Sequence, residues 1–227
     1  MKIIVKDDFL EDPEHSRKLA NTGNFEGSCD HNEYHWNDLK TKEPRDSEKY
    51  NRIFSKLLEE EVLCVDDSFR KYNICLERPD KKVHVHHHDV DYIAIVYLNH
   101  PELETDGTAI MKHIETGIEY KDEQRFGSEI TAEGDWQSDS YDLSKWETKM
   151  FIPMKFNRLL IFEPRYYHTE TRTFGKTIEE GRCVELFHII KKEKINYWKE
   201  FWKEDIESGE YDLPAEFFKN ENDYEKR

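Results

Sequence analysis

Four of the eleven histidines in this chain fall within the run VHVHHHD between Val83 and Asp89. Side chains of an extended strand alternate between its two faces, so the even-numbered histidines, beginning with His84 and His86, would share one face. Two imidazoles at positions i and i+2 can bind one metal ion, and iron, manganese, copper and zinc all accept imidazole ligands. The run therefore predicts a metal site, in preference to a histidine-rich strand end that faces solvent.

A third metal ligand should come from a distant strand that the fold brings close. An apolar strand that ends at Phe162 is followed by a turn and then by His168. A histidine at this rim could complete the site from the opposite sheet. We therefore expect His84, His86 and His168 to be the metal ligands.

Two shifts of register stay open. The pair His87 and Asp89 would form a His-x-Asp motif, with His168 as the third ligand. Alternatively, His88 replaces His84 if the strand is shifted by two residues.

An arginine opens an otherwise apolar strand fourteen residues after His168. This residue, Arg182, is costly to bury unless it meets an anion. A small dicarboxylate held by paired hydrogen bonds would meet that need. An internal salt bridge to a barrel carboxylate is the alternative.

The elements that must position these residues are two helices followed by short strands. Helical spacing and charge pattern predict helices over residues 11–21 and 46–63, with an irregular segment over 22–45. The strands are rich in β-branched and aromatic residues. We expect them at 2–5, 72–77, 82–87, 91–99, 107–113, 149–154, 157–162 and 182–190. An α+β protein built on a β-sandwich or barrel follows.

Two further segments carry aromatic side chains. Residues 114–150, with Trp136, Tyr141 and Trp146, form a long acidic stretch that is typical of an active-site lid or of a disordered insert. After Lys191 we expect a helix that ends near Gly209. Its aromatic stripe indicates packing on the barrel or a homodimer contact, and consists of Trp198, Phe201 and Trp202.

Length and composition favour one domain over residues 1–227. Residues 1–70 would be a helical N-terminal support, 72–190 the barrel and 191–227 a C-terminal helix and tail. Apolar residues make up 36% and charged residues 37% of the chain, so we expect a thin core that depends on its aromatic residues.

The net charge of −16 disfavours a nucleic-acid partner, since phosphate binding depends on Lys and Arg. No apolar run is long enough for a membrane span, and the N-terminus lacks the apolar stretch of a signal peptide. The four cysteines are scattered with no C-x-x-C pair. We therefore expect a cytoplasmic protein with reduced thiols.

Several motifs in order resemble the prolyl-hydroxylase-like branch of the iron(II)/2-oxoglutarate-dependent oxygenases, in particular its small bacterial and phage members. The motifs are IIVKDDFLEDPE, DYIAIVYLN, DGTAIMKH, FNRLLIFEPRYYH and GRCVELFHI, within residues 1–190. The resemblance implies a double-stranded β-helix (jelly-roll or cupin-like) core with N-terminal helices and a C-terminal helix. It also implies iron(II) and 2-oxoglutarate as cofactors, and hydroxylation of a small-molecule or peptide substrate.

Site residues carry over position by position. His84 matches the first ligand of the family's His-x-Asp motif, and His168 matches the distal histidine. Arg182 matches the arginine that binds the distal carboxylate of 2-oxoglutarate, and Tyr97 matches a tyrosine that hydrogen-bonds the same carboxylate.

The sequence departs from the family at His86, where the motif has aspartate. Three histidines would then form the triad and leave the metal with more effective positive charge. The related cupins use three-histidine iron sites without 2-oxoglutarate, and the spacing His84-x-His86-x4-Asp91 imitates their His-x-His-x4-Glu motif.

Three hypotheses follow from this departure. The first is a 2-oxoglutarate-dependent non-heme iron oxygenase. The second is a three-histidine dioxygenase that needs no 2-oxoglutarate and acts on a chelating metabolite. The third is a metal-binding protein that has lost catalysis.

Overall fold

The computed structural model describes residues 1–23, 25–26, 38–41, 47–65, 71–77, 83–100, 106–121 and 139–203, and the statements below concern these residues. The helices are α1 (Pro13–Thr22), α2 (Ser47–Leu58) and α4 (Ile195–Phe201), with short 3₁₀ turns at Leu143–Lys145 and Lys192–Lys194. The strands of the N-terminal part are β1 (Ile3–Lys6), β2 (Phe25–Glu26), β3 (Asp38–Thr41), β4 (Val62–Val65) and β5 (Lys71–Cys75). Those that follow are β6 (Tyr92–Tyr97), β7 (Gly107–His113), β8 (Trp146–Pro153), β9 (Arg158–Phe162), β10 (His168–Glu170) and β11 (Arg182–Lys191).

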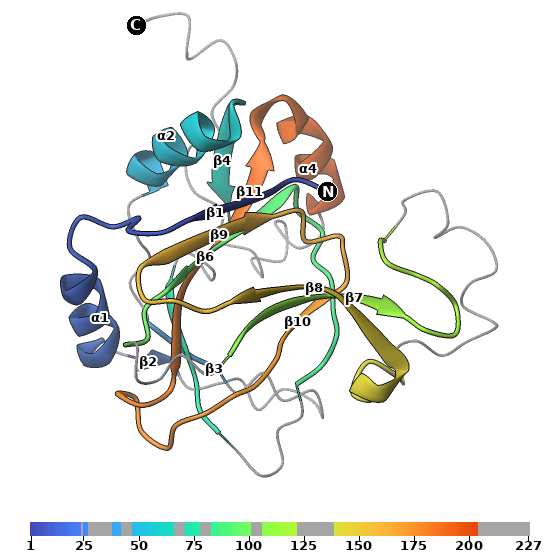
Figure 1. Ribbon diagram of the computed structural model, residues 1–227. Coiled ribbons are helices and arrows are strands. Elements are labelled where there is room, and N and C mark those ends of the chain that lie inside the picture. Colours follow the sequence, from blue (N-terminus) through green and yellow to red (C-terminus); the bar gives the residue numbers. More distant parts are fainter. Residues whose placement is uncertain are drawn as a thin grey trace, which may run out of the picture.

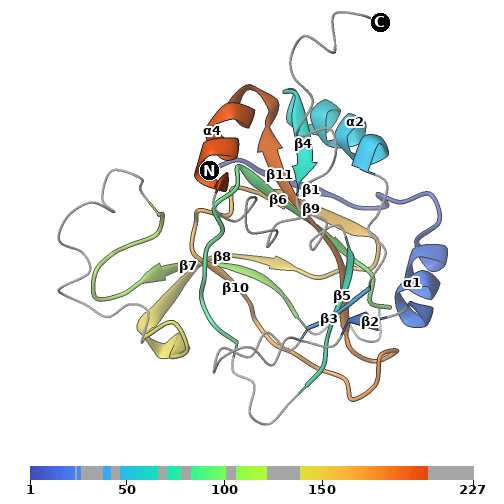
Figure 2. The same cartoon turned by 180° about the vertical axis from the view of Figure 1, so that it is seen from behind.

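The described strands form two antiparallel sheets that face each other in two layers (Figure 1). The larger sheet has the order β1-β9-β6-β11-β5-β3-β2, and β4 pairs with the end of β11. The smaller sheet has the order β10-β7-β8. Seen from behind, α1 and α2 lie beside the larger sheet (Figure 2).

Strand β6 explains how both faces of the larger sheet are buried. Alternate side chains of a strand point to opposite faces. Ile93, Ile95 and Tyr97 join a core cluster that also contains Ile110 and Ile152 from the smaller sheet. This first cluster fills the space between the sheets, and it is there that the functional residues also lie.

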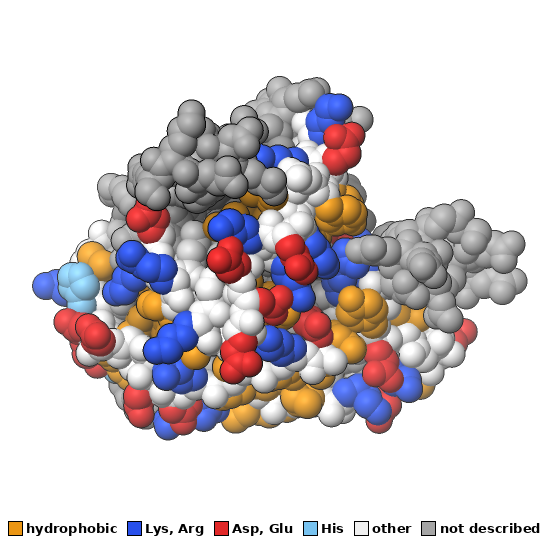
Figure 3. Space-filling view, turned by 90° about the horizontal axis from the view of Figure 1, so that it is seen from above, with side chains coloured by type: hydrophobic (Ala, Val, Ile, Leu, Met, Phe, Trp, Pro, Cys, Tyr) orange, Lys and Arg blue, Asp and Glu red, His pale blue; other side chains and the backbone are white. Residues whose placement is uncertain are grey.

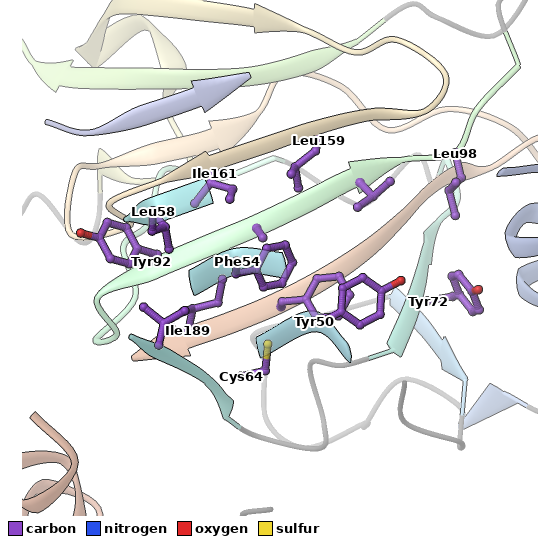
Figure 4. Close-up of a cluster of buried hydrophobic side chains, with 14 of the residues drawn as sticks. Tyr50, Phe54, Leu58, Cys64, Tyr72, Tyr92, Leu98, Leu159, Ile161 and Ile189 are labelled. Carbon is purple, nitrogen blue, oxygen red and sulfur yellow. The ribbon is translucent and has the colours of Figure 1, made fainter. Parts of the chain in front are cut away.

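A second cluster fills the outer face of the larger sheet, where α2 packs (Figure 4). Tyr50, Phe54 and Leu58 recur at helical spacing and meet the outward side chains of β6, β9 and β11. The Phe54 and Phe187 rings are 5.2 Å apart in an edge-on contact. Burial of these aromatic rings offsets the low apolar content of the chain.

The smaller sheet is extended by the histidine segment, although only one residue of that segment forms a β-bridge. His86 N–H donates to the His168 carbonyl and His168 N–H donates to the His86 carbonyl, both at 2.9 Å. Val85 N–H donates to the Ser140 carbonyl on the other side of this segment. Of the expected strand over 82–87, the structure retains one β-bridge, between His86 and His168 of β10, and one hydrogen bond from Val85 to Ser140.

Several boundaries differ from those expected from the sequence. The predicted helix 46–63 ends at Leu58, because Glu59 adopts a left-handed φ of 59° and the chain then forms β4 against β11. The segment 22–45, expected to be irregular, contains β2 at the edge of the larger sheet and β3 between β2 and β5. The N-terminal part thus contributes strands as well as helices.

The expected loop over 114–150 is shorter at its C-terminal end, because β8 begins at the buried Trp146. Trp136 lies outside the described residues. In the C-terminal stripe, Trp198 and Trp202 pack into the core between the sheets as expected, but Phe201 is 51% exposed. The division into one domain and a homodimer contact both stay predictions.

Acidic and basic side chains are interspersed on the face seen in Figure 3. Cys64, Cys75 and Cys183 are buried and form no disulfide, and Cys29 lies outside the described residues. Among the described helices, none has both the length and the apolar character needed to cross a membrane.

Candidate metal centre

Three histidines converge between the sheets. Each of His86, His88 and His168 offers a ring nitrogen, and these nitrogens all lie within 4.8 Å of one another. The ring centroids of His86 and His168 are 4.5 Å apart, and that of His88 lies 5.0 Å from His86 and 5.4 Å from His168. Three imidazoles at this spacing form a donor set that a transition-metal ion can bind.

The backbone explains why His86 and His168 meet. They exchange both N–H···O bonds, so they form a directly opposed antiparallel pair whose side chains project to the same side. His88 lies two residues further along the segment, and its N–H donates to the Pro164 carbonyl at 3.0 Å. Both ends of the turn after β9 are therefore tied to the histidine segment.

Hydrogen bonds to the backbone select the tautomer of two of the rings. His86 Nδ1 lies 3.1 Å from the His84 carbonyl, and His168 Nδ1 lies 2.7 Å from the Tyr166 carbonyl. A carbonyl oxygen can only accept, so each Nδ1 must carry the proton and donate. The Nε2 lone pairs of both rings are then available to a metal ion, an arrangement common among metal-binding histidines.

Burial keeps two of these imidazoles, His168 and His88, neutral. His168 is 4% exposed, and desolvation holds its pKa well below the ordinary value. Desolvation also lowers the pKa of His88 well below that value, and the neighbouring His188 and His86 add to the effect. Neutral imidazole is the form that binds metal, so the surroundings favour binding.

The predicted ligand His84 is not a member of the converging group. Its ring lies 4.8 Å from that of His86 and stacks at 5.1 Å on the exposed Tyr141. The structure thus brings together the set with His88 in place of His84. The roles of these histidines as ligands stay predictions.

The residues of the two alternatives that include a carboxylate ligand contact other parts of the chain. His87 projects to the opposite side, where its ring meets that of Tyr167 at 5.4 Å, and Asp89 binds Lys121 Nζ at 2.6 Å. Asp91, the carboxylate of the cupin-like spacing, accepts from Lys191 N–H and Trp198 Nε1–H. Among the described residues no carboxylate belongs to the converging group.

Arg182 lies at the far end of the same interior and has an internal partner. Its Nε donates to Asp106 Oδ2 at 2.8 Å, and the side chains of both residues are buried. Burial alone would lower the pKa of Arg182, but the charge of Asp106 raises it above its ordinary value. The alternative interpretation of Arg182, an internal salt bridge, is therefore confirmed. The bond uses one of the five N–H donors of the guanidinium.

Tyr97 lies beside Arg182, as the resemblance implies. The Arg182 guanidinium carbon is 5.8 Å from the centre of the Tyr97 ring, and the Tyr97 hydroxyl forms a 2.7 Å hydrogen bond with Thr108 Oγ1. Burial raises the pKa of Tyr97, so its hydroxyl stays protonated. Tyr97 and Arg182 together form a polar end of an otherwise apolar interior.

Two residues of this interior were missed from the sequence. Asp106 precedes β7, and its Oδ1 accepts from the backbone N–H groups of Thr171 and Arg172 and from the Thr171 hydroxyl. His188 lies on β11 with its ring 4.9 Å from that of His88. The period-2 pattern of β11 was the available signal, because it places His188 on the same face as Arg182.

Comparisons with known proteins add little. No protein-family model matches the sequence, and no curated protein matches it. Among solved structures, the fold is similar to the crystal structure of HygX from Streptomyces hygroscopicus with nickel and 2-oxoglutarate bound. The TM-score is 0.40 and the identity 9%, over 84% of this chain and 83% of that chain. A likeness this weak carries no argument.

Proposed function

We propose that this protein is a metal-dependent oxygenase with a double-stranded β-helix fold. The strand order β9-β6-β11-β5 in one sheet and β8-β7-β10 in the other supports the fold. The histidine segment, bonded to β10, extends the smaller sheet by one more chain. Two facing four-chain layers with this connectivity are what a double-stranded β-helix requires.

The observation that carries the function is the convergence of His86, His88 and His168 between the sheets. The donor set fits a divalent transition metal, because the His86 and His168 rings are fixed in the tautomer that leaves Nε2 free, and burial keeps the His168 and His88 rings neutral. Three protein ligands leave coordination positions for dioxygen and a co-substrate. Bound iron(II) would supply the redox chemistry with dioxygen that oxygenation needs.

We assign 2-oxoglutarate as the co-substrate. Arg182 can donate to its distal carboxylate through nitrogens that Asp106 does not use, and paired N–H donors suit a carboxylate. The Tyr97 hydroxyl can donate to the same carboxylate while accepting from Thr108. Val184 and Leu186, the inward side chains of β11 between the two ends, are apolar and pack in the core cluster between the sheets.

The test is oxygen consumption by purified protein supplied with iron(II), with and without 2-oxoglutarate. We expect uptake to require 2-oxoglutarate and to yield succinate. Arg182→Lys, which keeps the charge but not the paired donors, should raise the 2-oxoglutarate concentration needed. Failure to bind or consume 2-oxoglutarate would reject this assignment.

A second candidate is favoured by the internal pairs of the arginine end. Both residues expected to hold the co-substrate already have partners, Asp106 for Arg182 and Thr108 for Tyr97. A dioxygenase whose substrate chelates a metal ion held by three histidines would not need residues that bind the distal carboxylate of 2-oxoglutarate. Oxygen uptake that is independent of 2-oxoglutarate would support this candidate, and strict dependence would exclude it.

A further inference from the structure

A fourth buried imidazole faces the converging histidines from the other sheet. His188 is 5% exposed and lies on the inner face of β11. The neighbours on that face, Leu186 and Ile190, pack into the apolar core between the sheets. Its partners across the strands, Ile93 and Val65, are aliphatic. A buried polar ring in such a strand lowers stability unless it makes a specific interaction.

The His188 ring contacts the ring of His88. The centroids are 4.9 Å apart and the planes meet at 66°, so the edge of one ring points to the face of the other. Edge-to-face contacts of this kind fix relative orientation, because the positive ring edge is attracted to the electron-rich face. His188 is thereby in a position to set the plane of the His88 ring.

The other two rings of the group are held differently. His86 and His168 are fixed by reciprocal backbone bonds and by their Nδ1–H bonds to carbonyls two residues earlier. His88 lies beyond the bridge, and its ring contacts those of His86, His168 and His188. Of these three neighbours, His188 alone stands outside the converging group and comes from the larger sheet.

We propose that His188 is a positioning residue of the metal centre, which holds the His88 imidazole in the orientation needed to bind the metal. This inference rests on the proposed function. The ligands come from the histidine segment and β10, and His188 would be a residue of the larger sheet that orients one of them. Residues that orient metal ligands typically change metal affinity by about 10–100-fold when they are replaced.

The test is titration of metal-free protein with cobalt(II), followed by its visible absorption. Three variants are compared with the unaltered chain: His188→Ala, His188→Phe and Ile190→Ala. The last removes packing from the same face of β11 without touching His88. Circular dichroism and urea unfolding establish that each variant is folded.

We expect His188→Ala to weaken cobalt(II) binding about tenfold or more and to alter the absorption bands, which report ligand geometry. His188→Phe should restore affinity to within about threefold, because a phenyl ring can supply the edge contact. Ile190→Ala should lose stability but keep the affinity and the spectrum.

Unchanged affinity and spectrum in His188→Ala would overturn the inference, as would failure of His188→Phe to restore binding or an equal loss in Ile190→Ala. These results would leave the proposed function intact as long as the unaltered chain binds cobalt(II). If the unaltered chain binds none, the metal centre itself is rejected.

Discussion

The two ends of the interior between the sheets hold buried polar groups in opposite ways. At one end, Arg182 has its counter-charge within the chain, from Asp106 at 2.8 Å. At the other, His86, His88 and His168 converge on one another with no carboxylate of the described residues in the group. Strand β11 spans both ends, since the Cα atoms of Arg182 and His188 lie on one face about 20 Å apart. The Arg182 guanidinium itself lies nearer the histidines, because it lies over the Tyr97 ring, and Tyr97 pairs with Val184.

The two ends differ in the kind of partner that their buried polar groups have. The buried guanidinium of Arg182 is paired with a carboxylate of the chain, so the fold itself balances its charge. Three imidazoles whose ring nitrogens lie within 4.8 Å of one another offer lone pairs that one metal ion can accept, so metal binding would stabilise this end. The histidine end is therefore the stronger evidence for function, and the arginine end serves the fold whether or not it also binds a ligand.

The largest effect on stability should come from removing the carboxylate that pairs with Arg182. Asp106→Ala leaves a buried, unpaired arginine and frees two backbone N–H groups, so we expect unfolding free energy to fall by about 3–5 kcal/mol in urea denaturation. Lys155→Ala, which removes an exposed ion pair with Asp7, is the control and should have a much smaller effect. Equal losses in the two variants would show that the buried pair has no special role in stability.

Loss of a converging histidine should weaken metal binding without unfolding the protein. His88→Ala and His168→Ala are expected to lower cobalt(II) affinity by more than about 100-fold, beyond the range for residues that only orient ligands. His84→Ala is the matched control, because His84 contacts His86 but stands outside the group. If His84→Ala lowers the cobalt(II) affinity as much as His88→Ala does, the assignment of His88 in place of His84 is contradicted.

The metal-free protein should lose stability below neutral pH. The pKa of His168 is held well below its ordinary 6.5 by burial, and burial lowers that of His87 to about 4. Below pH 6.5 the unfolded chain therefore binds more protons than the folded one, and stability falls as pH falls. Each such histidine contributes up to about 1.4 kcal/mol per pH unit.

Urea unfolding of metal-free protein between pH 7 and pH 5 measures this slope. His168→Leu, which has no titrating ring, should show a shallower dependence than the unaltered chain. A flat profile for the unaltered chain would mean that the histidines are not held neutral.

The smallest effect concerns the hydroxyl of Tyr97. Tyr97→Phe removes the buried bond to Thr108, so we expect a loss of about 1 kcal/mol in unfolding free energy. If the arginine end binds 2-oxoglutarate, its dissociation constant should also rise about threefold to tenfold, as measured by calorimetry. A change in stability with no change in 2-oxoglutarate binding would assign Tyr97 to the fold alone.

Much of the sheet structure could be predicted from alternation and β-branched content. The expected strand over 107–113 matches β7, and the expected strands that became β6, β9 and β11 have ends within one or two residues of those observed. Short strands such as β3 and β10 were missed because their pairing with distant strands, not their composition, makes them strands.

The site was predictable in outline and not in register. Four histidines in five residues indicate a metal site, but which of them face inward depends on where the segment pairs with His168. A shift of two residues leaves the histidines on the same face of the strand and changes only which of them lies opposite His168. Alternation therefore cannot distinguish His84 from His88. The partner of Arg182 could not be predicted from the sequence either, because Asp106 is 76 residues away.

The central claim is that His86, His88 and His168 hold one metal ion, and X-ray absorption of protein loaded with iron(II) under nitrogen tests it most directly. We expect one iron per chain with three imidazole ligands, and we expect the number of imidazole ligands to fall to two in His88→Ala and to stay at three in His84→Ala. Protein that takes up no iron, or iron whose imidazole count is unchanged in His88→Ala, would contradict it.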